Sequence, residues 1–222
     1  MRFPLLAAIT LVALGTGPVC RAQGPARTQL RHAHVLRVLC DGETPAVITI
    51  HAISASLGYT DAASFEATGP DGATLARGTV APGESRQVML APPGGGCCIL
   101  VVDPLRNAFA VDVEGAEWAI DVGDDLCIDV IADARPLRFW LPAGTRRVPL
   151  RFSGEAATVR VVRPDGSLEQ EVTVPQYQTV SMVVDVPGGI EAGFWTLELQ
   201  LSEDLGVTLP IESDGLVVDH PV

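Results

Sequence analysis

Apolar and polar residues alternate along much of the chain with a period of two, which is the pattern of a β-strand with one buried and one solvent-facing side. Every second residue is apolar from Val180 to Val186, and again from Trp195 to Leu201. Similar runs predict strands at residues 47–53, 88–90, 97–102 and 109–113. No stretch carries the apolar stripe of an amphipathic helix, so the pattern predicts an all-β protein built from antiparallel sheets.

Turn motifs reveal an internal repeat with an offset of 94 residues. Three motifs recur in the same order: Gly69-Pro70-Asp71-Gly72 as Arg163-Pro164-Asp165-Gly166, Thr79-Val80 as Thr173-Val174, and Pro93-Gly94-Gly95 as Pro187-Gly188-Gly189. Proline and glycine suit tight turns, and strands that follow one another about every 8–12 residues are typical of a β-sandwich. We therefore predict two tandem antiparallel β-sandwich domains, jelly-roll or immunoglobulin-like, at residues 23–133 and 134–222.

Residues 1–22 have the features of an export signal. Arg2 gives a basic start, residues 3–14 are apolar, and glycine and proline end the run before Ala22. The run is too short for a membrane-spanning helix, which needs about 20 apolar residues. We expect cleavage after Ala22 and a secreted or periplasmic bacterial protein with no membrane span. The alternative is that Cys20 is acylated, which would make the chain a lipoprotein.

The formal net charge is −12, from 27 acidic and 15 basic residues, and it becomes −14 once two arginines leave with the signal. An acidic chain repels the phosphate backbone, so the composition argues against a nucleic-acid partner. Aromatic residues make up only 5% of the chain, which is few for a protein that stacks sugars on rings.

The turn and strand motifs resemble a tandem β-sandwich module of large secreted proteins of environmental bacteria. They are Pro70-Asp71-Gly72, Gly78 to Arg86, Leu100 to Pro104 and Asn107-Ala108-Phe109, then Phe139 to Thr145 and Phe152-Ser153-Gly154. The module is also similar to bacterial pre-peptidase C-terminal domains, which are non-catalytic. The resemblance covers most of the chain after the signal and implies the architecture, with no catalytic residues. Cys97 and Cys98 depart from the pattern, because an aromatic residue is expected there.

Four cysteines remain after the signal, namely Cys40, Cys97, Cys98 and Cys127. An even number of cysteines in an exported protein suggests disulfides. Adjacent strand residues point to opposite faces, so Cys98, which aligns with Trp195, should face the core and Cys97 the outer side. We expect Cys40 to pair with one of these two and Cys127 with the other. The alternative is that the cysteines are small buried apolar side chains.

No motif of the chain predicts catalysis, a cofactor or a metal site. The sequence has no Gly-x-Ser-x-Gly elbow and no phosphate-binding Gly-Lys-Ser/Thr loop. His32 and His34 would share one face of a strand, and with His51 they are the candidate metal ligands, but no cysteine or acid stands at zinc spacing. The acidic residues from Asp121 to Asp133 offer only part of a calcium loop. A hydrolase, the rarer alternative, would need a pocket that joins one of these histidines to a carboxylate.

These observations predict a secreted, non-enzymatic β-sandwich protein that acts in adhesion, surface assembly or ligand presentation. Its partner would be an extracellular glycan or a surface protein. The alternative is a carbohydrate-binding module with Trp140 and Tyr177 as the candidate ligand-binding residues, whereas Trp195 is expected to lie in the core. Fold alone does not decide between these functions.

Overall fold

The structure is a computed structural model of the 222-residue chain, and it describes residues 28–122, 127–131, 136–186, 192–201, 203–209 and 216–218. This part of the chain forms β-strands and no helix, which confirms the all-β prediction. The first strands are β1 (Gln29–Arg31), β2 (His34–Cys40), β3 (Ala46–Ile53), β4 (Ala63–Thr68), β5 (Thr74–Val80), β6 (Ser85–Leu90), β7 (Gly96–Asp103), β8 (Ala108–Glu114) and β9 (Glu117–Asp121). They are followed by β10 (Cys127–Ile131), β11 (Leu137–Leu141), β12 (Arg147–Gly154), β13 (Ala157–Val162), β14 (Leu168–Val174), β15 (Gln178–Asp185), β16 (Gly193–Leu201), β17 (Asp204–Thr208) and β18 (Leu216–Val218).

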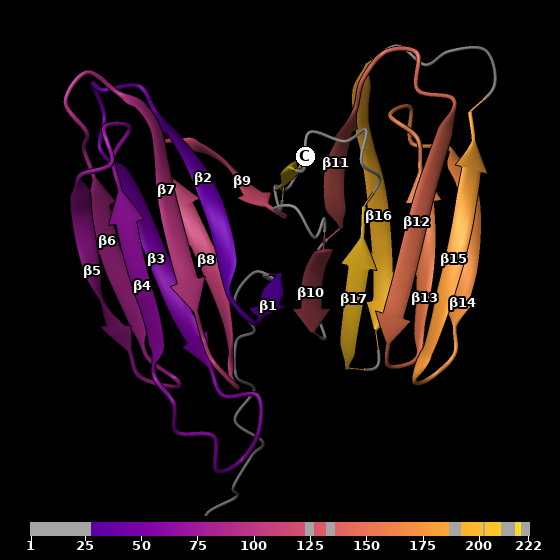
Figure 1. Ribbon diagram of the computed structural model, residues 1–222, viewed down its shortest axis with the longest axis horizontal. Coiled ribbons are helices and arrows are strands. Elements are labelled where there is room, and N and C mark those ends of the chain that lie inside the picture. The colour runs from indigo at the N-terminus through magenta and orange to yellow at the C-terminus, as the bar shows by residue number, and fades with distance from the viewer. Residues whose placement is uncertain are drawn as a thin grey trace, which may run out of the picture.

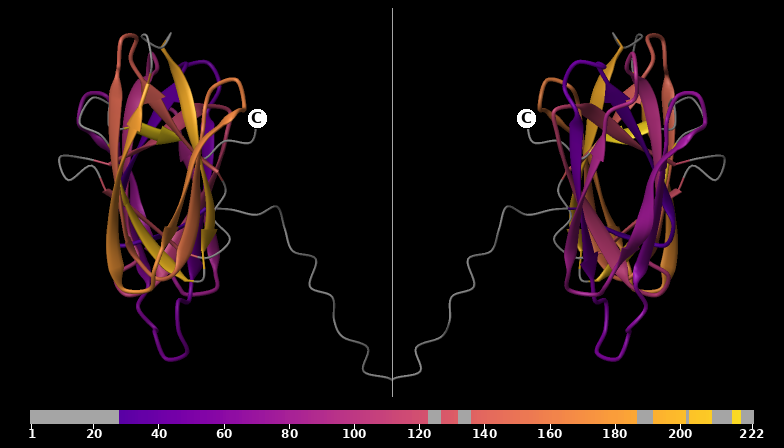
Figure 2. Two further views of the ribbon diagram at one scale, coloured as in Figure 1. Left: turned by 90° about the vertical axis from the view of Figure 1, so that its right-hand side faces the viewer. Right: turned by 90° about the vertical axis from the view of Figure 1, so that its left-hand side faces the viewer.

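These strands form two antiparallel sheets that face each other, as the edge-on views of Figure 2 show. Apolar side chains fill the space between the sheets. One sheet has eight strands in the order β15-β12-β17-β10-β1-β8-β3-β6. The other has ten strands in the order β14-β13-β16-β11-β18-β9-β2-β7-β4-β5. Two facing sheets make a β-sandwich. Both sheets run through from one side of the molecule to the other, and the division into domains at residue 133 stays a prediction.

The two sides of the molecule repeat one strand order, with β2–β8 on the left of Figure 1 and β11–β17 on the right. The order β1-β8-β3-β6 corresponds to β10-β17-β12-β15, and β9-β2-β7-β4-β5 corresponds to β18-β11-β16-β13-β14. We call β1–β9 the first half and β10–β18 the second half. Strands β13 and β14 begin 94 residues after β4 and β5, which is the offset of the turn motifs in the sequence. Gly72 and Gly166 take positive φ values of 81° and 83° in the matching turns.

The halves join at a seam where equivalent strands pair with each other. Strand β1 pairs antiparallel with β10 in one sheet, and β9 pairs antiparallel with β18 in the other. Antiparallel pairing of equivalent elements is what a local two-fold axis produces. Leu30, Ile120 and Val130 are buried beside the seam, and Arg31 of β1 forms an ion pair with Asp204 of β17 across it. The seam therefore covers the strand edges that each half would otherwise expose.

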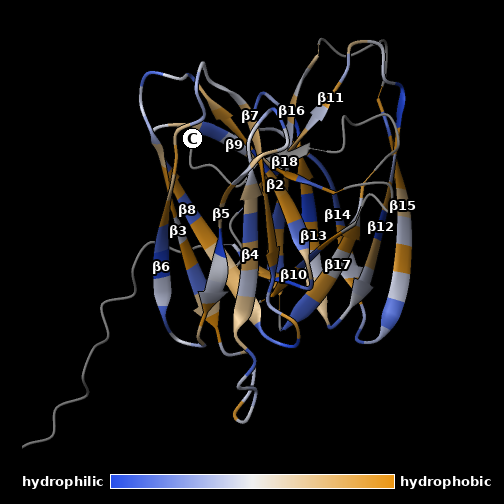
Figure 3. Cartoon of the chain, turned by 60° about the vertical axis from the view of Figure 1, so that its left-hand side comes forward, coloured by the Kyte–Doolittle hydropathy of each residue, from blue (hydrophilic) through white to orange (hydrophobic). Residues whose placement is uncertain are grey.

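Side-chain alternation places the apolar residues between the sheets, which gives the banded strands of Figure 3. Met182 and Val184 are buried as predicted, and Trp195 is only 1% exposed. Register places Cys98 of the first half where the second half has Trp195. The first half therefore fills the same position of its core with a much smaller side chain. None of the described residues forms a helix that could span a membrane.

Candidate functional site

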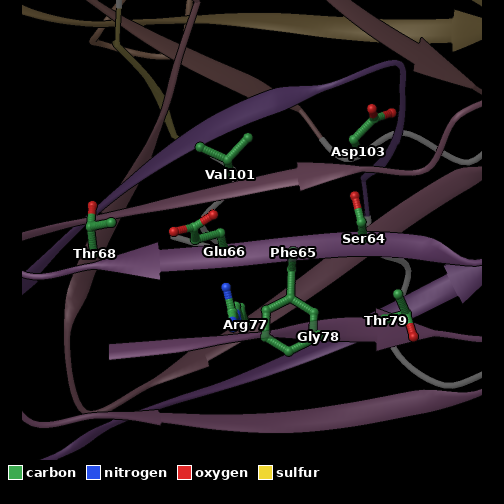
Figure 4. A pocket seen from close by; sticks show the side chains of 9 residues that line it. All are labelled: Ser64, Phe65, Glu66, Thr68, Arg77, Gly78, Thr79, Val101 and Asp103. Atoms are coloured by element: carbon green, nitrogen blue, oxygen red, sulfur yellow. The ribbon is translucent and has the colours of Figure 1, made fainter. Parts of the chain in front are cut away.

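A shallow depression lies on the outer face of the ten-stranded sheet, over strands β4, β5 and β7 of the first half (Figure 4). Its volume is about 750 Å³. It is lined by Ser64, Phe65, Glu66, Thr68, Arg77, Gly78, Thr79, Val101 and Asp103. Apart from Phe65, Gly78 and Val101, these residues carry hydroxyl or charged groups, although most of the exposed lining area comes from apolar atoms.

Strand register brings the polar side chains together from three segments of the chain. Ser64 of β4 lies opposite Thr79 of β5 and Asp103 of β7. Two residues further along β4, Glu66 lies opposite Arg77. Residues directly opposite each other share one face of a sheet, so both sets project from the same side. No local pattern in the sequence marks these residues, because the site depends on which strands are neighbours.

Two carboxylates of the depression are held in place by hydrogen bonds. Oγ1 of Thr74 donates to Oε1 of Glu66 at 3.0 Å, and the backbone N–H of Leu105 donates to Oδ1 of Asp103 at 2.8 Å. Each carboxylate has further lone pairs that can accept from a ligand. Within the described ranges, no ion pair or hydrogen bond engages the Arg77 guanidinium. The depression therefore presents a guanidinium, two oriented carboxylates and several hydroxyls.

Arg86 of edge strand β6 lies beneath the depression, on the inner side of the ten-stranded sheet. It bridges to edge strand β5 at the open side of the sandwich. Its Cζ lies 5.1 Å from the centroid of the Phe65 ring, and Nη1 donates to the carbonyl oxygen of Thr79 at 3.3 Å. A Cβ at Gly78 would lie only 2.5 Å from that Nη1. Glycine at this position therefore lets the guanidinium reach β5 and hold it against the facing sheet.

The second half carries an ion-pair cluster at the equivalent place. By register, Arg160 takes the position of Glu66, and Glu198 takes that of Val101. Nη1 of Arg160 lies 2.6 Å from Glu198, and its Nε lies 3.4 Å from Glu171. In the second half the guanidinium is paired with two carboxylates, whereas the first half leaves its guanidinium open to a ligand.

Trp140 and Tyr177, the candidate sugar-binding residues, lie far apart. The half-buried Trp140 ring packs edge-on against Phe194 at the start of β16, with ring centroids 5.0 Å apart and an interplanar angle of 71°. Tyr177 is 78% exposed in the turn between β14 and β15, where a hydrogen bond to Glu155 raises the pKa of its phenol. That turn lies beyond Leu201 at the other end of β16, about 23 Å along the strand. The two rings therefore do not form one site, and a binding role for either stays a prediction.

His32 and His34 do not share a face. His32 is exposed with a φ of 60°, whereas His34 is buried at the start of β2. The expectation was wrong because the chain bends at His32, which interrupts the alternation that a continuous strand would have. In the portion that the structure describes, no three His, Cys, Asp or Glu side chains gather as metal ligands. Asp124, Asp125 and Asp133 of the acidic stretch lie outside that portion.

His51 meets both a carboxylate and a hydroxyl on the outer face of the eight-stranded sheet. Its Nε2 lies 3.0 Å from Oδ2 of Asp112, and its Nδ1 lies 2.7 Å from Oγ of Ser85. The sequence marks His51 but gives no reason to join it to the other two. Strands β3, β6 and β8 supply one residue each, and only their register brings these residues together.

The cysteines separate by face as predicted. Cys40 and Cys98 are buried with their sulfur atoms 3.8 Å apart, whereas Cys97 is half-buried on the other side of its strand. Burial, together with the neighbouring Cys40, raises the pKa of Cys98 to about 12. The described residues contain no disulfide, and the side chain of Cys127 lies outside them. Of the two partners that the sequence left open for Cys40, the geometry favours Cys98.

No family model and no curated protein matches this chain. Among solved structures, it is similar to the M60 catalytic domain with the CBM51-1 and CBM51-2 domains of ZmpB from Clostridium perfringens, with 9% identity and a TM-score of 0.32. That alignment covers 86% of this chain and 34% of the other, so this chain spans about a third of its length. The chain is also similar to the STIV MCP, with 12% identity, a TM-score of 0.19 and coverage of 85% and 89%. TM-scores of this size carry no conclusion about function.

We predict that Cys40 and Cys98 form a disulfide in an oxidising compartment. The sulfur atoms need to move closer by only about 1.8 Å to reach bonding distance. The raised pKa leaves little thiolate once the core has closed, so the bond should form during folding rather than after it. Alkylation of the denatured, unreduced protein followed by peptide mass spectrometry should leave both residues unlabelled. Alkylation of both without reductant would contradict the prediction.

A second prediction concerns His34, whose pKa is lowered from its usual value near 6.5, chiefly by burial and against the opposing charge of Asp129. The unfolded chain then binds a proton at this residue more readily than the folded chain. The free energy of unfolding should therefore fall as the pH drops below about 6.5, and urea titrations between pH 7 and pH 5 would measure this. The variant His34→Leu should lose most of the dependence. If the free energy of unfolding of His34→Leu falls with pH as steeply as that of the wild type, groups other than His34 cause the pH dependence.

Proposed function

We propose that this chain is an exported binding protein for ligand presentation or adhesion, and that it holds a saccharide in the depression over β4, β5 and β7. The observation that carries the proposal is the difference between the two halves. At one sheet position the second half closes its charges into ion pairs, while the first half keeps a guanidinium and two carboxylates facing solvent. Solubility alone would not require charged groups that are unpaired in the first half and joined in ion pairs in the second half.

The lining suits hydrogen bonding to a polyhydroxylated ligand. The carboxylates of Glu66 and Asp103 accept from sugar hydroxyls, and the guanidinium of Arg77 donates to hydroxyl or ring oxygens. Val101, which is 39% exposed, offers a small apolar contact to a pyranose face. Phe65, the aromatic residue of the lining, is buried and offers no ring for stacking, so we expect weak binding, with a Kd on the order of 1 mM.

The overall charge favours a neutral saccharide over an acidic one. The chain carries a net charge of −12, which disfavours the approach of polyanions such as uronic-acid polymers. The export signal predicted at residues 1–22 would bring the protein to the compartment where glycans and surface proteins are found. These points support a neutral glycan as the first ligand class to test.

Titration of a panel of neutral oligosaccharides, followed by NMR, tests the proposal at Arg77. The variant Arg77→Ala should weaken binding roughly ten- to a hundredfold, because a hydrogen bond to a charged group contributes about 1.5–3 kcal/mol. Thr79→Val should also weaken binding. Its matched control is Thr173→Val, because Thr173 holds the same position in the second half and should leave binding unchanged.

The outcome also separates this site from the Trp140 alternative. Binding that survives Arg77→Ala but is lost in Trp140→Ala would assign the ligand to the Trp140–Phe194 ring pair. Failure of every neutral oligosaccharide at millimolar concentration would overturn saccharide binding altogether. The remaining functions, adhesion through a protein partner and surface assembly, would then take its place.

A further inference from the structure

We infer that Ser85, His51 and Asp112 form a nucleophile, base and orienting acid that can cleave small carboxylic esters. The site lies on the outer face of the eight-stranded sheet, whereas the depression lies on the ten-stranded sheet. The inference thus goes beyond the proposed binding function and stands independently of it. The two contacts that carry it are the 2.7 Å from Ser85 Oγ to Nδ1 of His51 and the 3.0 Å from Nε2 to Asp112.

Strand pairing explains why these side chains meet. Ser85 lies directly opposite His51 in the β3–β6 register. The N–H of Ala52 donates to the carbonyl of Glu84 at 3.0 Å, which makes that pair a hydrogen-bonded one. Pairs alternate along an antiparallel ladder, so His51 and Ser85 form a non-hydrogen-bonded pair, the kind in which side chains are closest. Asp112, which lies opposite Thr49 on the other side of β3, reaches His51 diagonally.

The hydrogen-bond chain also fixes the direction of proton transfer. The carboxylate of Asp112 can only accept, so Nε2 of His51 carries the ring proton and Nδ1 holds a lone pair. The Ser85 hydroxyl then donates to Nδ1, as the nucleophile does in a catalytic triad, although there the base faces the serine with its other nitrogen. The side chains of His51 and Asp112 are 18% and 33% exposed, and Ser85 is exposed. The base and the acid are therefore sheltered, while a carbonyl group can reach the nucleophile from solvent.

The open edge of the sheet supplies a donor for the developing oxyanion. Strand β6 is the last strand of its sheet. In a non-hydrogen-bonded pair the backbone N–H points away from the partner strand, so the N–H of Ser85 is directed to that open edge. The N–H of the nucleophile itself is one of the two oxyanion donors in serine proteases.

The reaction needs only an ester and water. Ser85 Oγ attacks the ester carbonyl carbon while its proton passes to Nδ1 of His51, and Asp112 stabilises the imidazolium. The C–O bond to the leaving group then breaks, and the alcohol takes the proton from His51. Water attacks the acyl-Ser85 ester with His51 again as base, which releases the carboxylic acid and restores the hydroxyl.

The second half shows that the sheet does not need these residues for pairing. Ser153, Thr179 and Thr208 take the positions of His51, Ser85 and Asp112, respectively. None of the three is a base or an acid at neutral pH. The first half therefore has an imidazole and a carboxylate at positions where the second half has only hydroxyl groups.

The test is hydrolysis of p-nitrophenyl acetate by the full chain, followed by release of p-nitrophenolate. We expect Ser85→Ala and His51→Gln to lower the rate roughly a hundredfold, the usual contribution of a general base. Thr179→Ala, the matched control in the second half, should keep the wild-type rate. Melting temperatures close to that of the wild type would show that these outer-face variants still fold.

Two further measurements separate catalysis from general surface reactivity. A fluorophosphonate probe should phosphonylate the protein with loss of fluoride, and peptide mass spectrometry should locate the label on Ser85. Asp112→Asn should lower the rate, because Nε2 of His51 loses the carboxylate that orients the ring, while Asp112→Glu should restore part of the rate. A wild-type rate in Ser85→Ala, or a label at any other residue, would overturn the inference.

Discussion

The structure depends on one constraint: the apolar faces of its two sheets can be buried only against each other. Each half alone would have to end both sheets at β1 and β9, which would expose unpaired backbone groups. Pairing β1 with β10 and β9 with β18 satisfies those groups and extends the apolar layer across both halves. His34, the buried and neutral histidine, lies close to this seam, within the influence of Asp129 on β10. A pH-sensitive group therefore stands where the two repeats meet.

Because the fold occurs twice in the chain, equivalent positions of the two halves can be compared to find residues that the fold does not require. Turn positions that the fold requires are filled alike in both halves, as with Gly72 and Gly166. Positions that differ show what one copy does in addition. The open guanidinium of Arg77 and the histidine chain at Ser85 both belong to the first half. Both proposed sites therefore lie on the outer faces of the first half, while the second half supplies the partner strands for the seam.

Features with a local cause could be predicted from the sequence. Alternation marked the strands at residues 47–53 and 109–113, and turn chemistry marked the 94-residue repeat, because both depend on near neighbours in the chain. The seam and both candidate sites depend on register between distant strands, which alternation does not specify. The sequence therefore points to Trp140 and Tyr177 as exposed rings but carries no signal for Arg77. The bend at His32 had no sequence signal either, since no glycine or proline marks it.

Differential scanning calorimetry tests most directly the claim that both sheets run through the seam as one unit. The account predicts a single transition in which the calorimetric and van't Hoff enthalpies agree. For roughly 200 residues at about 0.7 kcal/mol per residue, that enthalpy is about 140 kcal/mol. Two transitions, each with a van't Hoff enthalpy near half that value, would show that the halves unfold separately. That result would contradict the claim that the paired strands at the seam hold the repeats together.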